Sequence, residues 1–154
     1  MSDPTTPFAV QAGEGKSLET PTGDLVTIKA HTRNTNGSMS VLEIAVEPKS
    51  GPALHTHLRG RAVVGARRRV PVQSRRRHAP RGAGGMAFGP RGVPHAFQNV
   101  GDTRGRLLVI ATPSGLERFF EQFAEASGAD VLAEIGIANW IEFAGPPLAI
   151  SNPI

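Results

Sequence analysis

The sequence predicts an all-β domain, a sandwich or a barrel, followed by one or two α-helices. Two early segments, 25–30 and 39–47, alternate apolar and polar side chains with the period of two that a half-buried strand shows. Turns rich in glycine and proline separate such segments at short spacing, with no helical period between them. After residue 113 the apolar residues change to helical spacing. A chain of 154 residues is long enough to bury the core of one such domain.

The early part of the chain contains an arm and the first strands. Residues 1–19 are polar and contain glycine, and we expect an N-terminal arm that lies along a neighbour or stays mobile. On the two alternating strands one apolar face is expected to be buried: Val26, Ile28 and Ala30 on the first, Leu42, Ile44 and Val46 on the second. A third strand follows the break made by Pro48 and Pro52.

This third strand carries a His-x-His pair. Side chains alternate along a strand, so His55 and His57 project to the same side, with Thr56 opposite. Two imidazoles at this spacing can bind one metal ion, but the pair taken alone favours solvent-facing histidines or histidines satisfied within the core. His95 follows a Gly/Pro turn and opens an apolar run, so it can supply a third ligand from a neighbouring strand.

The segment from Gly84 to Asn99 resembles the second motif of the cupins, small β-barrels whose two motifs supply metal ligands. That motif is written G-x5-P-x-G-x2-H-x3-N. Every fixed position is matched in this chain, by Gly84, Pro90, Gly92, His95 and Asn99.

The first cupin motif is matched only in part. It carries a His-x-His pair, then a Glu three or four residues on, then a Gly, whereas this chain has Arg61 and Ala62 where the Glu is expected. The resemblance therefore covers residues 20–57 and 84–120. The segment Ile141–Leu148 also resembles the tail of single-domain bacterial cupins similar to quercetin dioxygenase.

The resemblance implies a cupin double-stranded β-helix, or jelly-roll barrel, over 20–113, with C-terminal helices and a tail over 114–154. It implies a metal ion held by His55, His57 and His95, and a homodimer. We expect an apolar site for a small-molecule substrate beside the metal, although each of its residues also fits an ordinary core; these residues are Phe88, Phe97 and Ile110.

Three neutral imidazoles suit Fe, Mn, Ni, Cu or Zn, and the sequence does not choose among them. The resemblance implies a dioxygenase that acts on a small planar or enolisable substrate. Without the Glu, and with Arg61 in its place, we expect a weaker metal site than the family norm. The alternative is a non-enzymatic cupin that binds a small ligand or regulates a partner.

The span 58–83 interrupts the cupin pattern, and we expect it to be irregular. It holds nine arginines, from Arg59 to Arg81, and no Asp or Glu occurs from Pro48 to Gly101. Without these nine charges the net charge of +4 becomes −5, so the basic pI near 10.6 belongs to one segment. Three interpretations compete: an arm that binds nucleic acid or a phosphorylated ligand, a solvated loop, or out-of-frame translation of a GC-rich gene. We favour the third and do not expect nucleic-acid binding.

The C-terminal part of the domain is predicted to be helical. Ser114 and Glu117 form a capping-box pattern, and an aromatic stripe follows at helical spacing, which we expect to pack on the barrel or across a dimer. Asp130 begins a second helix that extends toward Trp140. The remaining histidines, His31 and His78, lie outside the motifs.

Composition sets the cellular context that we expect. The chain has no cysteine, which excludes disulfides and thiolate metal sites. The start of the sequence lacks a signal-peptide pattern, and no apolar run reaches the ~20 residues that a membrane-spanning helix needs. We therefore expect a soluble cytoplasmic protein.

Overall fold

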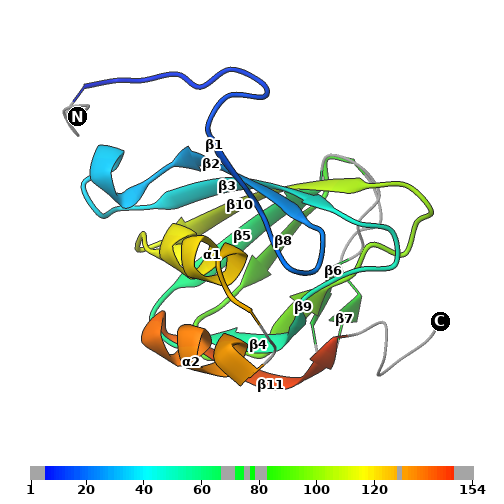
Figure 1. The fold of residues 1–154 in the computed structure, drawn as a ribbon. Helices are drawn as coiled ribbons and strands as arrows, with labels where there is room; N and C mark the ends of the chain where they lie inside the picture. The colour runs from blue at the N-terminus through cyan, green and yellow to red at the C-terminus, as the bar shows by residue number, and fades with distance from the viewer. Residues whose placement is uncertain (1–5, 67–71, 75–76, 79–82, 128–129, 148–154) are drawn as a thin grey trace.

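Two antiparallel β-sheets face each other, and two short helices lie at the open side between them (Figure 1). The computed structural model describes residues 6–66, 72–74, 77–78, 83–127 and 130–147. This is the architecture that the sequence predicted, an all-β barrel with C-terminal helices.

The first sheet has six strands in the order β1-β2-β3-β10-β5-β8. Their bounds are β1 Lys16–Glu19, β2 Leu25–Ala30, β3 Ser40–Val46, β10 Gly105–Thr112, β5 Arg61–Ala66 and β8 Met86–Gly89. The second sheet has five strands in the order β11-β4-β9-β6-β7. Their bounds are β11 Ile141–Pro147, β4 Ala53–His57, β9 His95–Phe97, β6 Val72–Ser74 and β7 Arg77–His78.

The hydrophobic core lies on the inner face of the six-stranded sheet. Its buried members come from β2, β3 and β10 and are Val26, Ile28, Leu42, Ile44, Val46, Leu107 and Val109. Phe97 of the opposite sheet and Leu116 and Phe120 of the first helix pack against them. The buried faces predicted for β2 and β3 are confirmed, because alternation along each strand sends every second side chain to this core.

The span 58–83 is more regular than the sequence suggested. β5 pairs with β10 on one side and β8 on the other, and β6 pairs with β9 and β7. Backbone pairing with neighbouring strands accounts for these extended segments, although apolar and polar residues do not alternate in their sequence. Residues 67–71, 75–76 and 79–82 and the side chain of His78 lie outside the described residues. The three interpretations of the arginines therefore stay predictions; reading the gene in its other frames tests the frame-shift.

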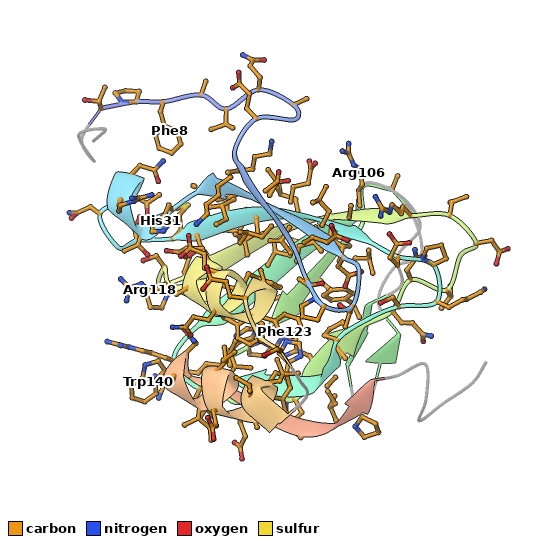
Figure 2. The ribbon with its side chains drawn as sticks, viewed as in Figure 1. Phe8, His31, Arg106, Arg118, Phe123 and Trp140 are labelled. Atoms are coloured by element: carbon orange, nitrogen blue, oxygen red, sulfur yellow. The ribbon has the colours of Figure 1, made fainter. Side chains whose placement is uncertain are left out.

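The N-terminal segment contributes an edge strand. β1 pairs with β2, so the strand begins within the segment that was expected to be an arm. Residues 6–15 precede it and run away from the sheet, as the blue trace in Figure 1 shows. Phe8 on this stretch is exposed (Figure 2).

Helix α1, Leu116–Ala124, is anchored by a buried carboxylate. The N-cap is Gly115 and not Ser114 as predicted, because the Ser114 hydroxyl is instead hydrogen-bonded to the Thr32 hydroxyl, at 2.9 Å. Glu117 accepts hydrogen bonds from the Thr32 amide and hydroxyl, the Ser40 hydroxyl and the Gly115 amide. Glu117 thereby ties the helix to β3 and to η1, a short 3-10 helix over Thr32–Asn34.

Helix α2, Asp130–Ala138, leads into β11. Gly136 of α2 lies so close to β11 that a Cβ there would come within 2.7 Å of the Phe143 ring. Among the described residues, no helix is long and apolar enough to cross a membrane.

Candidate metal centre

Three histidines converge on the inner face of the five-stranded sheet. His55 and His57 lie on β4 with Thr56 between them. His95 is the first residue of β9 and pairs directly with His55. The ring centroids are 5.1 Å apart for His55 and His57, 4.8 Å for His55 and His95, and 5.1 Å for His57 and His95. One ring nitrogen from each histidine lies within 4.8 Å of the other two.

This spacing is close to that of a metal site and slightly wider. Two nitrogens bound to one ion at ~2.1 Å are separated by ~3 to 3.5 Å, depending on the coordination geometry. The three nitrogens are thus grouped as a metal site requires, with a spacing of up to 4.8 Å that is wider than that of a bound site. The sequence prediction that separate motifs bring His55, His57 and His95 to one point agrees with this placement.

Backbone carbonyls fix the tautomer of two of the rings. Nδ1 of His55 lies 2.8 Å from the Ala53 oxygen, and Nδ1 of His95 lies 2.8 Å from the Val93 oxygen. Because a carbonyl only accepts, each Nδ1 donates its proton and each Nε2 keeps a free lone pair. Such an outer hydrogen bond orients a histidine and raises its basicity as a metal ligand.

The histidines are held in the neutral form that binds metals. Burial, with a smaller contribution from His95, lowers the pKa of His55 to about 4. Burial and the neighbouring imidazoles lower the pKa of His57 to about 3. Burial also lowers the pKa of His95. All three rings are therefore neutral at pH 7, so a metal ion does not have to displace a proton.

No carboxylate joins the three histidines within the described part of the chain. Glu142 is opposite Thr56 in the β4–β11 pairing, but it is exposed, and alternation turns it away from the histidines. Glu117 is buried against Thr32 and Ser40. The side chain of Arg61, at the family's Glu position, lies outside the described residues. Among the described residues, the candidate centre thus consists of neutral side chains only.

Two of the three predicted substrate-binding residues lie on the outer face of the six-stranded sheet. Phe88 is 53% exposed, and its neighbour Gly89 is the residue that faces His95. Ile110 alternates with the buried residues Val109 and Ala111, so it points to the opposite face from the core. The predicted placement of Phe88 and Ile110 beside the metal is therefore corrected. Phe97 is half-buried and packs against the core.

A cluster of phenylalanine side chains, which the sequence did not reveal, lies beside His55. Phe143 of β11 is opposite His55 in the strand pairing, and its ring centroid lies 6.4 Å from that imidazole. Phe119 of α1 lies 6.3 Å from Phe143 and stacks on Phe123 at 5.7 Å. Figure 2 shows Phe123 reaching from α1 toward the space between the sheets. The aromatic stripe of α1 was visible in the sequence, but its meeting with β11 was not.

The other fixed residues of the second motif shape the turns around the histidines. Asn99 is buried and donates to the carbonyl oxygens of Val46 at 3.0 Å and Thr103 at 2.8 Å, so its role is structural. Gly92 has a φ of +76°, which a side chain would disfavour, and its amide donates to the His57 oxygen at 3.0 Å. This bond ties the turn before His95 to the strand that carries His57.

Comparison with known proteins gives similarity in structure and not in sequence. No family model and no curated protein matches the sequence. An RmlC-like cupin from Shewanella frigidimarina superposes with a TM-score of 0.61 at 16% identity, over 74% of this chain and 96% of that one. KdgF from Halomonas sp. gives 0.61 at 14% identity, over 70% and 94%. A predicted oxalate decarboxylase from Thermotoga maritima gives 0.59 at 18% identity, over 69% and 99%.

Identities this low establish the fold alone. The two facing antiparallel sheets, their strand order and these superpositions agree with one another. The chain therefore has the double-stranded β-helix fold of the cupins.

Proposed function

We propose that this chain is a metal-dependent cupin that binds one divalent transition ion through His55, His57 and His95 and acts on a small organic molecule at that ion. The observation that carries the proposal is the convergence of three neutral, largely buried imidazoles, two of them with the tautomer fixed by a backbone carbonyl. Fe, Mn, Ni, Cu and Zn all suit this donor set.

The residues around the centre have separate tasks. The carbonyl oxygens of Ala53 and Val93 orient two imidazoles. Phe143 lies at one flank of His55, and Phe119 of α1 lies beside Phe143. A divalent ion bound here would supply Lewis-acid chemistry, lowering the pKa of a hydroxyl on the substrate and holding reactants in contact.

The charge of the site favours an anionic substrate. With neutral ligands only, a divalent ion keeps both of its charges, and no Asp or Glu occurs between Pro48 and Gly101 to offset them. One additional unit charge at 4 Å contributes about 4 kcal/mol at an effective dielectric near 20, before the cost of removing the ligand from water. A carboxylate or an enolate is therefore the ligand class that we propose. Oxidation of an enolisable substrate by dioxygen is the finer form of the proposal, supported by the sequence resemblance of 141–148.

The first experiment measures metal content and affinity. Purified protein is expected to bind about one equivalent of zinc or cobalt, and His95→Ala should lose it because two imidazoles do not hold an ion tightly. His31→Ala is the matched control, since His31 caps η1 and stands outside the cluster. Equal metal content in wild type and His95→Ala contradicts the proposal.

A non-enzymatic ligand-binding cupin is the second candidate. It is favoured by the lack of a carboxylate beside the histidines, because such a group could accept a proton from the substrate. Oxygen consumption by the iron-loaded protein with a flavonol or a 1,3-diketone separates the two candidates. Binding of these compounds without oxygen uptake favours the non-enzymatic form. The homodimer stays a prediction, which sedimentation analysis tests.

A further inference from the structure

Gly89, the last residue of β8, lies against the ring of His95. A Cβ added to Gly89 would be 3.0 Å from both Cε1 and Nε2 of His95 and 3.3 Å from Cδ2. These three atoms form the end of the ring that carries the free lone pair. Nearly equal distances to all three place the added atom over the ring face, because an atom in the ring plane beyond Nε2 would be clearly closer to the nitrogen.

Backbone conformation does not explain a glycine at this position. The φ angle of Gly89 is outside the positive range in which glycine is favoured, unlike those of Gly84 and Gly92. Glycine within a strand costs stability and often marks a place where another group approaches closely. The close neighbour here is the imidazole of His95, so the contact itself accounts for the absence of a side chain.

The contact joins the two sheets at the metal centre. Gly89 belongs to the six-stranded sheet, where it pairs with Ala62, and His95 belongs to the five-stranded sheet, where it pairs with His55. The Val93 oxygen holds Nδ1 of the same ring. His95 is therefore held at one edge by a hydrogen bond and on one face by the Gly89 backbone. It is 9% exposed and has little space into which to move.

We propose that Gly89 is a positioning residue for the metal centre: its bare backbone fixes the ring plane of His95, so that Nε2 points to the site shared with His55 and His57. The inference rests on the proposed function. A methyl group at this position pushes the imidazole by a few tenths of an ångström and misdirects its lone pair, without removing a ligand atom.

The experiment compares wild type, Gly89→Ala and Gly65→Ala. Gly65 is the matched control because it lies on the adjacent strand β5, has no positive φ, and an added Cβ there meets nothing closer than the Leu108 oxygen at 3.9 Å. Zinc affinity is measured by chelator competition, and the visible spectrum of bound Co(II) reports the ligand geometry. Gly89→Ala should bind zinc about 10- to 100-fold more weakly, with a shifted Co(II) spectrum, while Gly65→Ala matches wild type.

The outcomes separate this inference from the proposed function. Failure of the wild type to bind zinc contradicts the proposed function itself. Zinc binding by the wild type that Gly89→Ala leaves unchanged, in affinity and in Co(II) spectrum, overturns only the role of Gly89. If Gly89→Ala does not fold, proton NMR of the wild type decides: a nuclear Overhauser effect between the Gly89 α-protons and the His95 ring supports the contact, and its absence overturns it.

Discussion

The barrel contains two clusters of titratable side chains, one around Glu117 and one of three histidines. They differ in how many of their hydrogen-bonding atoms have a partner in the protein. Glu117 is fully buried and accepts hydrogen bonds from Thr32, Ser40 and the Gly115 amide. His55 and His95 each donate one hydrogen bond, and within the described residues their Nε2 atoms have no hydrogen-bond partner. A carboxylate whose acceptors are all occupied serves the fold, whereas converging imidazoles with free lone pairs fit a metal site.

The pKa values of the two clusters are lowered for opposite reasons. Burial alone would raise the pKa of Glu117, but the donated hydrogen bonds outweigh it and lower the pKa to about 2. For the histidines burial itself lowers the pKa, because a buried imidazole resists taking a charge. The first cluster is stabilised as an ion and the second as neutral rings.

The largest expected effect is a loss of folding stability in acid, caused by the histidine cluster. The folded pKa values, about 4 for His55 and about 3 for His57, lie below the ordinary 6.5. The unfolded chain therefore binds more protons, and stability falls as pH drops from 6.5 toward 4, by about 3 kcal/mol for His55 alone. Urea unfolding of metal-free protein at several pH values measures this fall. His57→Leu should show a smaller slope, and a flat profile between pH 6.5 and 4.5 contradicts the buried neutral cluster.

Removing the anchor of α1 should have the next largest effect. Glu117→Ala leaves the Thr32 amide and the Ser40 hydroxyl without their acceptor and is expected to cost about 2 to 4 kcal/mol of unfolding free energy. The contribution of the carboxylate is present above pH 4.5 and is lost as pH falls toward 2, because the folded pKa is the lower one. Chemical denaturation measures the loss. Glu121→Ala is the control on the same helix, paired with the exposed Lys16, and an equal loss there counts against the anchoring role.

Replacing a titratable side chain by an apolar one should raise stability at the histidine cluster, whereas at Glu117 it lowers stability. His57→Leu is expected to stabilise the metal-free protein by about 0.5 to 1 kcal/mol, because a polar ring kept for binding gives way to an apolar side chain. Metal binding should weaken at the same time. Thermal unfolding with and without zinc measures both effects. A metal-free His57→Leu protein that is less stable than wild type indicates that His57 serves packing.

The smallest effect is expected at Phe88. Because this side chain is exposed on the outer face of the six-stranded sheet, Phe88→Ser should change stability by less than about 0.5 kcal/mol and leave zinc affinity unchanged. Phe97→Ser is the contrast, since Phe97 packs against the core. A loss of zinc affinity in Phe88→Ser would contradict the outward orientation and indicate that Phe88 faces the barrel interior.

The sequence predicted those features that depend on local patterns. The period of two in 25–30 and 39–47 indicated which side chains form the core, and the spacing of His55 and His57 placed both on one face of a strand. Both predictions hold because alternation is a property of each strand by itself. That His95 joins the pair was predicted from the resemblance of 84–99 to the second cupin motif, because no local pattern brings β9 beside β4.

The features that escaped prediction depend on contacts between distant segments. Phe88 was predicted to face the barrel interior, but it faces outward. The strand β8 is short and follows glycines, so its sequence does not show which alternate residues face inward. Phe143 gave no local sign that β11 returns to pair with β4. Glu117 fitted a local capping box, and only the fold brings Thr32 and Ser40 to it.

The pairing of β11 with β4 has a consequence for biosynthesis. β4, which carries two of the three imidazoles, gains its second flanking strand only when translation has passed residue 147. Until then the nascent barrel presents these rings from an unprotected edge, where any available ion can reach them. Access to this pair of histidines is thus expected to differ before and after β11 pairs with β4.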